Sequence, residues 1–478
     1  MPKREAIRRG VLLAGLACAW LLLACAPALA HASLVEASPP QGSEVSNPPD
    51  RVELRFSEPV DAEFDPVMVR GADGTRVDTR DAHVDPDDAR VVLAYLERVP
   101  EGSYTVKWRV TSIDGHVVEG RYAFAVAATA KNWPTKDAGE KDTSAEDAGA
   151  QSGHHGGHHG GGAERVAAPH QREPISESAA GRATSSGAAS IEHGLALAAS
   201  AFLAGLAPFV ALVWLPASRQ TGAAGHGALR PFGVLAWALL CVLAVAGVGE
   251  LSAYAVRASG EPFSTGLFAQ TLFGSRVGEV WLIRLALALL TAAAITAAAG
   301  SGRTWEWGVA TATGGLLLMT LTGLSHAAAT GRILPLVADW THAVAAAVWM
   351  GGLLGFVVAL FFGQLRSLPP DRQAKLRERS VRRFSTVATI AVAVLAATGL
   401  YAALLHVPSP QALVDTPYGR ALLVKLGLLA LVLAIGTCNL LLRGRGPFGR
   451  LMTVELLLAL GLFVATGFLT SLPPASGT

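Results

Sequence analysis

A long apolar run near the C-terminus decides much of the fold of this chain: Leu428-Leu429-Ala430-Leu431-Val432-Leu433-Ala434-Ile435. The run belongs to a segment long enough for an α-helix to cross a bilayer, which takes about 20 residues. Similar runs recur through the chain after residue 190, and only 16% of all residues are charged. An average soluble domain has roughly 25% charged residues. The C-terminal part is therefore predicted to be an all-α polytopic membrane domain over residues 191–473.

Eight transmembrane helices are predicted in this domain. Their ranges are 192–216, 232–256, 277–299, 305–325, 335–362, 384–406, 419–442 and 450–472. Lys and Arg collect in the loops after the first, third, fifth and seventh runs, most densely between Arg366 and Arg383, and the alternate loops are nearly bare. Because cytoplasmic loops are the basic ones, the first run is predicted to enter from outside. Both the N-terminal domain and the C-terminus then face the periplasm of a bacterial inner membrane.

Residues 1–30 are predicted to be a secretory signal peptide. A basic start with Arg8 and Arg9 precedes the apolar stretch 11–23, and Ala28-Leu29-Ala30 is an A-x-A cleavage signal. A lipoprotein-like site at Cys25 is the competing interpretation, and lipidation there would leave His31 inside the chain. Cleavage after Ala30 is favoured, and it makes His31 the first residue of the mature protein.

Residues 31–127 are predicted to form an all-β domain. Val52-Glu53-Leu54-Arg55-Phe56 alternates apolar and charged side chains, as expected for a half-buried strand. Further strand-like stretches are 67–70, 90–93, 102–110 and 120–126. Several short strands within about a hundred residues favour a Greek-key barrel or sandwich. The domain has no cysteine, so no disulfide framework stabilises it.

Three residues of this domain are candidate metal ligands: His31, Asp114 and His116. A histidine at the mature N-terminus would present a free α-amine and an imidazole, which together chelate a metal. Asp114 and His116 are two residues apart, so they lie on the same side of an extended strand. This nitrogen and oxygen set suits Cu(II). The alternative without a metal site is that Asp114 caps a turn and His116 is an exposed loop residue.

The domain resembles the CopC family of periplasmic copper-binding proteins. The resemblance lies in His31-Ala32-Ser33-Leu34, Ser38-Pro39-Pro40-Gln41-Gly42-Ser43, Leu54-Arg55-Phe56-Ser57-Glu58-Pro59, and Gly102-Ser103-Tyr104-Thr105-Val106-Lys107-Trp108 running into Asp114-Gly115-His116. It implies a cupredoxin-like β-barrel that holds Cu(II) through His31, Asp114 and His116. It also places Glu58 where the family often has an acidic residue near the ligands. The methionine-rich Cu(I) site of some members is absent from this sequence, and His83 is expected to be a surface histidine.

Residues 128–190 are predicted to form a disordered, His-rich linker, because Gly, Ala, Ser and charged residues dominate there and cannot build a core. Four histidines of the linker are candidates for auxiliary metal capture: His154, His155, His158 and His159. The alternative is a plain spacer whose histidines add solubility.

Several polar residues interrupt the apolar runs, where they are costly and often functional. The candidate membrane copper path consists of His193, His326, Asp339, His342 and His406. The predicted directions place all of them in the outer half of the bilayer, and Asn439 and Glu455 in the inner half. Asp339 and His342 are three residues apart and share one helix face. A proton relay and a structural hydrogen-bond network are alternative roles for them, and Arg284 is expected to pair with Glu250 or Glu279.

The membrane domain resembles the CopD family of inner-membrane copper-resistance proteins. The matching stretches are Ser325-His326-Ala327, Asp339-Trp340-Thr341-His342, Trp349-Met350-Gly351-Gly352, Arg383-Phe384-Ser385, Thr398-Gly399, Thr416-Pro417-Tyr418-Gly419-Arg420 through Lys425, and Glu455. The family's usual role is copper import across the inner membrane. The order of the two parts resembles the fused copper-uptake proteins of some bacteria.

Together these features predict a copper-binding and copper-importing membrane protein that contributes to copper homeostasis or resistance, and not an enzyme. Its partners are then copper ions, the lipid bilayer and periplasmic copper chaperones. The net charge of +2 gives no basic field for nucleic acid. Two alternatives remain: a membrane-anchored copper buffer or sensor without transport, and a membrane haem or copper oxidoreductase.

Overall fold

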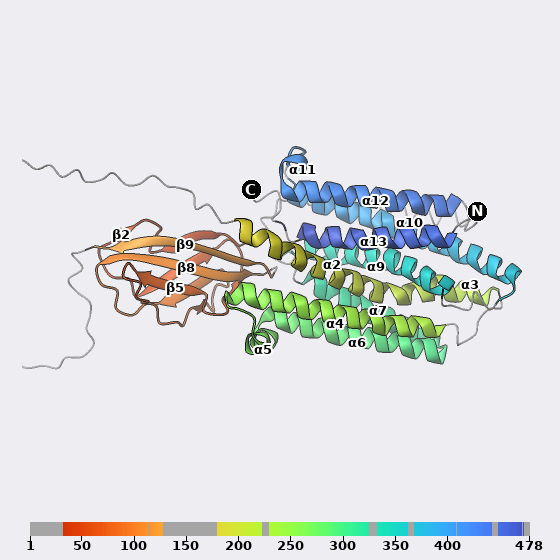
Figure 1. Cartoon of the computed structure of the whole chain (residues 1–478), viewed down its shortest axis with the longest axis horizontal. Coiled ribbons are helices and arrows are strands. Elements are labelled where there is room, and N and C mark those ends of the chain that lie inside the picture. Colours follow the sequence, from red (N-terminus) through yellow and green to blue (C-terminus); the bar gives the residue numbers. More distant parts are fainter. Residues whose placement is uncertain are drawn as a thin grey trace, which may run out of the picture.

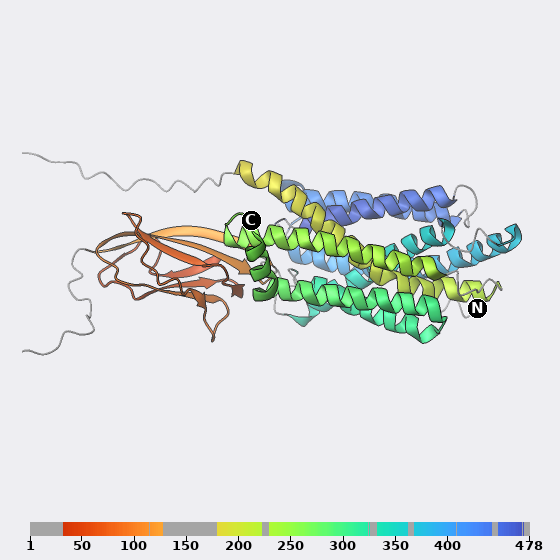
Figure 2. The ribbon, with the colours of Figure 1, turned by 60° about the horizontal axis from the view of Figure 1, so that its bottom comes forward.

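The computed structural model combines a β-sandwich with a bundle of long helices (Figure 1). It describes residues 32–113, 115–127, 179–221, 229–323, 325, 332–361, 368–407, 409–441, 448–470 and 472. The sandwich lies at one end of the bundle, beside the C-terminal end of one long helix and a short helix, in both views (Figures 1 and 2). We call this end of the bundle the near end and the opposite one the far end.

The sandwich consists of two sheets. One has the strand order β1 (Leu34–Ser38), β3 (Arg51–Phe56), β7 (Val91–Tyr95) and β6 (His83–Val84). The other has the order β2 (Glu44–Val45), β9 (Val117–Val126), β8 (Gly102–Ser112) and β4 (Val60–Asp61), and β5 (Val67–Gly71) also pairs with β8. All pairs are antiparallel except β2 with β9. The predicted all-β domain and its five predicted strands, now β3, β5, β7, β8 and β9, are therefore confirmed. β1 was not predicted, and the structure does not establish a Greek-key topology.

The core of the sandwich follows from the alternation seen in the sequence. Val52, Leu54 and Phe56 on β3 point inward and are buried, and the charged residues between them face outward. The rings of Trp108 on β8 and Phe56 pack edge to face, with their centroids 5.2 Å apart. Burial of such large side chains stabilises the domain by about 1.5–3 kcal/mol each.

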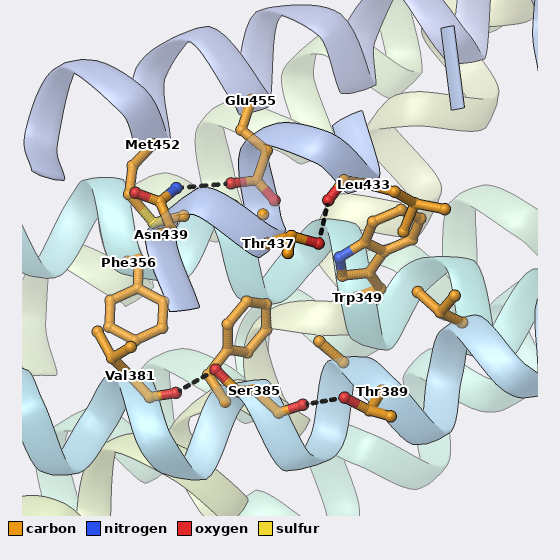
Figure 3. Close-up of a pocket in the computed structure, with 14 residues that line it drawn as sticks. Trp349, Phe356, Val381, Ser385, Thr389, Leu433, Thr437, Asn439, Met452 and Glu455 are labelled. Carbon is orange, nitrogen blue, oxygen red and sulfur yellow. Dashed lines mark hydrogen bonds between the residues drawn. The ribbon is translucent and has the colours of Figure 1, made fainter. Parts of the chain in front are cut away.

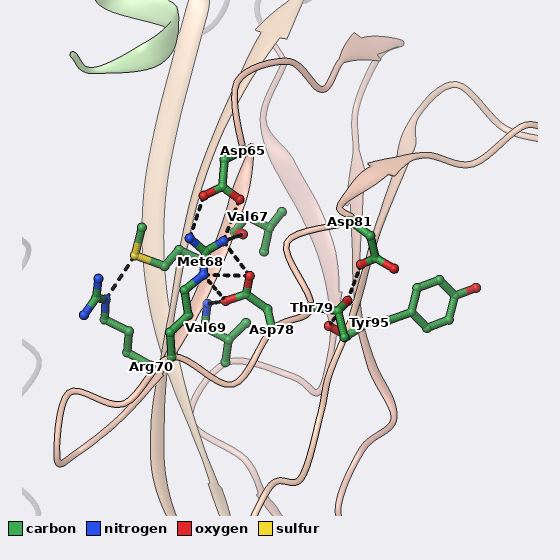
Figure 4. A network of polar contacts seen from close by, with 10 residues as sticks. Asp65, Val67, Met68, Val69, Arg70, Asp78, Thr79, Asp81 and Tyr95 are labelled. Atoms are coloured by element: carbon green, nitrogen blue, oxygen red, sulfur yellow. Dashed lines mark hydrogen bonds and ion pairs between the residues drawn. The ribbon is translucent and has the colours of Figure 1, made fainter. Parts of the chain in front are cut away.

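A buried ion pair secures the segment that follows β5 (Figure 4). The Arg76 guanidinium donates to both carboxylate oxygens of Asp78 and also to Asp65. Asp78 in turn accepts the backbone N–H of Val69 at 2.7 Å. A buried carboxylate is tolerated only with such partners, so this network fixes the loop to the sheet.

The helical part consists of long helices and several short ones. In chain order they are α2 (Ala179–Phe209), the short π-helix η1 (Val210–Trp214), α3 (Leu215–Arg219), α4 (Arg230–Ser259), α5 (Thr265–Gly274), α6 (Arg276–Ser301), α7 (Thr304–Thr322), α9 (Ile333–Phe361), α10 (Pro370–His406), α11 (Ala412–Asp415), α12 (Pro417–Leu441) and α13 (Phe448–Thr470). α2 packs against α4, α7, α9 and α13, and is thus the central helix of the bundle.

Seven helices in the described ranges are long and apolar enough to cross a membrane. α7 occupies the predicted fourth span but falls outside this set, since Glu306 and several Thr and Gly residues make its 19 residues less apolar than the others. The protein is thus a multi-pass membrane protein, and the count of eight spans stays a prediction.

Two helices begin earlier than predicted. α2 starts at Ala179, where disorder was expected up to residue 190, because alanine is the best helix former and extends the membrane helix outward. α10 starts at Pro370 instead of near residue 384. Its first turns carry many basic residues, which hid the helix from a search for apolar runs. Linker residues 128–178 lie outside the described ranges.

Glycines bring α2 and α9 into close contact. A Cβ added at Gly205 would collide with the backbone carbonyl of Ala347, and one at Gly351 would collide with Gly205. Gly427 on α12, in contrast, has nothing within 4 Å of an added Cβ. The central pair of helices therefore depends on the absence of a side chain at these crossing points.

We predict that Gly205→Ala lowers the thermal stability of the purified full-length protein, because overpacking a tight contact costs about 1–3 kcal/mol. The matched control Gly427→Ala should leave stability unchanged or slightly raised, since alanine favours helices. Size-exclusion chromatography after heating measures both variants. Equal melting temperatures for the two would contradict the tight crossing.

Candidate metal centre and domain interface

Three segments of the chain meet at one end of the sandwich. Ser33, near the start of the described chain, donates its backbone N–H to Ser57 Oγ at 3.0 Å, and Ser57 returns its own N–H to the carbonyl of Ser33 at 2.9 Å. Ala32 is buried in the core. The N-terminal segment is thereby fastened beside the end of β3, directly before Glu58.

Glu58 links this segment to the turn that carries the predicted Asp114 and His116 ligands. It is only 6% exposed, and its carboxylate accepts a hydrogen bond from the hydroxyl of Ser112, the last residue of β8. The turn closes through the Gly115 N–H to the Ser112 carbonyl at 2.9 Å and the Ser112 N–H to the His116 carbonyl at 2.8 Å. Gly115 has φ of +84°, a conformation that favours glycine.

The predicted copper ligands are only partly described. His116 follows the turn and is half-buried, while His31 and Asp114 lie outside the described residues. Among described residues, no group of three or more His, Cys, Asp or Glu side chains is arranged to hold a metal, so the three-ligand set stays a prediction. His83 is exposed, as expected, and its Nδ1 donates to the carbonyl of Asp81 at 2.7 Å.

The same end of the sandwich rests on the near end of the helical bundle. Thr111 Oγ1 on β8 lies 3.0 Å from the hydroxyl of Tyr254 on α4. The Tyr254 hydroxyl also donates to Glu63 Oε2 at 3.3 Å. Around these bonds, Phe64 and Val117 of the sandwich pack with residues of α4, α5 and α6, including Val277. The end of the sandwich that carries His116 therefore faces the membrane helices.

A polar cluster lies one helical turn below this interface. Glu250 is four residues before Tyr254 on α4, and its Oε1 lies 2.6 Å from Nδ1 of His193 on α2. Its other oxygen lies 3.8 Å from Arg284 on α6, which bonds the hydroxyl and carbonyl oxygens of Thr320 on α7. The predicted pairing of Arg284 with Glu250 is confirmed.

A second polar cluster occupies the other side of the bundle. His342 on α9 bonds through Nδ1 to the hydroxyl of Thr398 on α10 at 2.8 Å. Lys425 on α12 lies within electrostatic range of both Asp339 and His342. His406 at the end of α10 donates from Nδ1 to the carbonyl of Ala402 in its own helix.

The predicted membrane histidines therefore belong to different surroundings. His193 faces α4, His342 faces α10 and α12, and His406 caps its own helix. His326 and the linker histidines His154, His155, His158 and His159 lie outside the described residues. Their roles in a copper path stay predictions.

Sequence reasoning missed the interface residues Tyr254, Glu63 and Thr111. Tyr254 stands 143 residues from Thr111 and 191 from Glu63, and no local pattern connects positions so far apart. The one available signal was a tyrosine close to the outer end of a predicted span, since tyrosine is enriched at membrane interfaces.

Comparison with known families defines the class of protein. The CopC domain matches residues 34–127, the N-terminal domain of Copper resistance protein D-like proteins matches 188–334, and Copper resistance protein D matches 378–469. A copper-family β-domain and a copper-family membrane domain thus occur in one chain. The protein belongs to the CopC–CopD family of copper resistance and copper transport proteins.

Several known proteins are similar to this chain or to parts of it. The chain is 28% identical over 459 residues to Copper transport protein CutJ of Bacillus subtilis (strain 168), covering 93% of this chain and 74% of that protein. It is 31% identical over 106 residues to Copper resistance protein C of Escherichia coli, covering 21% of this chain and 83% of that one. The crystal structure of CopC from Methylosinus trichosporium OB3b is 36% identical, with a TM-score of 0.19, and covers 20% of this chain and 93% of that chain.

The electrostatics of the interface depend on pH through Glu63. The pKa of Glu63 is raised from 4.5 to about 7, mainly by burial and also by the nearby Asp61, against the opposing effect of hydrogen bonds from the Arg276 backbone N–H and the Tyr254 hydroxyl. Burial also raises the pKa of Asp61, against the effect of Arg276. The docked form thus holds a proton that an exposed Glu63 releases, so docking weakens as pH rises from 4.5 to about 7.

We predict that the docked population is several-fold larger at pH 5 than at pH 8, and that Glu63→Gln removes most of this dependence because glutamine stays neutral. Distances between spin labels at Arg98 and Gln411, both exposed, measure docking after serine replaces Cys241 and Cys438. Glu101→Gln, at the opposite end of β8, is the control and should keep the wild-type profile. A pH-independent distance in the wild type would refute the prediction.

Proposed function

We propose that this protein captures Cu(II) in the periplasm with its β-domain and imports copper across the inner membrane through its helical domain. The observation that carries the proposal is the docking of the Ser112–His116 end of the sandwich onto α4, α5 and α6. CutJ, similar over 93% of this chain, is named a copper transport protein. Two alternative functions are a membrane-anchored copper buffer or sensor without transport, and a membrane haem or copper oxidoreductase. The experiments described below distinguish each of them from copper import.

In this proposal, capture uses the N-terminal amine and imidazole of His31 with the side chains of Asp114 and His116. Cleavage after Ala30 creates the amine. The bond from Ser112 to Glu58 supports the turn from behind, and the Ser33–Ser57 bonds hold the N-terminal segment next to it. Amine, imidazole and carboxylate ligands are those that Cu(II) prefers in tetragonal geometry.

Transfer then leads from the docked turn to the cluster below Tyr254. Glu250 holds Nδ1 of His193 at 2.6 Å, which leaves Nε2 as the ring nitrogen able to bind a metal. A carboxylate that orients a histidine in this way also raises its basicity toward a metal. His193 and Glu250 are therefore the proposed first acceptors in the membrane domain, with His326, Asp339, His342 and His406 as candidates farther along.

The proposed orientation places the near end of the bundle on the periplasmic side. The basic start of α10 belongs to the far end, where Arg379 donates to the backbone carbonyl of Gln220, next to α3. Basic segments stay on the cytoplasmic side of bacterial membranes, in agreement with a far end in the cytoplasm. Periplasmic copper chaperones are then the proposed donors to the β-domain.

We expect N-terminal sequencing of the mature protein to start at His31, and its Cu(II) EPR spectrum to change in His116→Ala with at least about tenfold weaker binding. His83→Ala removes an exposed histidine and should keep the wild-type spectrum. Another mature terminus, or an unchanged spectrum in His116→Ala, would remove the proposed capture site.

Copper accumulation in whole cells tests import. Deletion of the gene should lower cytoplasmic copper under copper limitation, and the wild-type gene should restore it. Unchanged cytoplasmic copper would contradict import and favour a membrane-anchored copper buffer or sensor. A Soret band in the purified protein would instead favour the oxidoreductase.

A further inference from the structure

A cavity of about 190 Å³ lies between α9, α10, α12 and α13 toward the far end of the bundle (Figure 3). Most of its lining is apolar, including Trp349, Phe356 and Phe384. Two strongly polar side chains, Asn439 of α12 and Glu455 of α13, also line it. Neither belongs to the polar clusters described above.

Asn439 and Glu455 are buried, at 5% and 2% exposure. Asn439 Nδ2 donates to Glu455 Oε2 at 3.0 Å, and an ionised carboxylate can only accept, so the bond fixes which way the amide points. Asn439 Oδ1 is consequently turned elsewhere, and among the described residues it has no hydrogen-bond partner. A buried carbonyl without a partner costs about 1–3 kcal/mol, so this oxygen is poised for a ligand.

The charge of Glu455 points to a positive ligand. A carboxyl group in the apolar interior of a membrane is held either as the neutral acid or as a carboxylate beside a positive charge. Within the part of the chain that the structure describes, no Lys, Arg or His forms an ion pair with Glu455. A cation at the carboxylate would neutralise it and displace the Asn439 N–H from Glu455. The freed amide would then turn its Oδ1 toward the ion.

Two further residues shape the site for a metal ion. Met452 precedes Glu455 by three residues on α13, so both face the same side, and Figure 3 shows its side chain beside Asn439. Its thioether is a soft ligand of the kind that copper accepts. Gly436 leaves space at the carboxylate, because a Cβ there would lie 3.1 Å from Glu455 Oε1.

We propose that Glu455, Asn439 and Met452 form a copper-binding site in the inner half of the membrane, which the ion occupies on its way to the cytoplasm. This inference rests on the proposed transport function. A set of one carboxylate, one amide oxygen and one thioether binds less tightly than the capture site, and a site in transit must release its ion.

The test uses the full-length protein in two assays. Copper content of the purified protein is measured in a His116→Ala background, so that loss of the membrane site is not masked by the capture site. Copper uptake is measured in proteoliposomes with the wild-type β-domain. We expect Glu455→Gln to lower bound copper by about one ion per chain and uptake at least tenfold.

Thr437→Val is the matched control. Thr437 lines the same cavity, but its hydroxyl donates to the carbonyl of Leu433 in its own helix, so copper content and uptake should stay near wild type. Size-exclusion profiles establish that both variants are folded, and Asn439→Leu provides a second variant that should also lose the ion.

The outcomes separate this site from the proposed function. If the wild type transports copper and Glu455→Gln changes neither uptake nor copper content, the site is refuted and transport stands. If the wild type does not transport but Glu455→Gln still loses its ion, transport is refuted and the site stands. If Glu455→Gln abolishes only the pH dependence of uptake and keeps its copper, Glu455 carries a proton, and the copper site is refuted.

Discussion

The hydroxyl of Tyr254 is the point on which the arrangement of the two domains depends. It lies within hydrogen-bond distance of Thr111 on β8 and of Glu63 beyond β4, and the apolar contacts of Phe64 and Val117 surround it. Tyrosine suits this position because its ring packs with apolar side chains while its hydroxyl bonds to polar ones. The same residue lies one helical turn from Glu250, so a single helix face connects the β-domain to the first polar cluster in the membrane.

Local periodicity predicted most of the longer elements, although the five-residue β1 and the ten-residue α5 were not predicted. β3 could be predicted from the alternation between Val52 and Phe56, and most membrane helices could be predicted from unbroken apolar runs. Two-residue strands such as β4 and β6 could not, because two residues have no period. The first turns of α10 were missed for the opposite reason: Arg372, Lys375 and Arg379 are good helix formers, but their charge resembles that of a loop.

The candidate site was less accessible from sequence than the fold. The motif around Asp114 and His116 and the position of Glu58 could be recognised, and the structure places Glu58 against the strand that leads into that motif. Charge counting predicted the half of the bilayer that holds each membrane histidine, but not the direction in which it faces around its helix. His193 and His342 were both predicted in the outer half, yet they face α4 and α10. The direction in which a histidine faces is determined by how the helices pack, and helix packing depends on side chains that are far apart in the sequence.

The covalent connection between the two domains has a consequence for how strong their contact must be. A free β-domain would have to find the membrane protein by diffusion, at the concentration at which it is present in its compartment. Within one chain the two surfaces meet at an effective concentration that the connection sets, up to about the millimolar range. A contact limited to the hydrogen bonds of Tyr254 and the apolar packing around them then suffices for frequent docking, and it stays weak enough to be reversible.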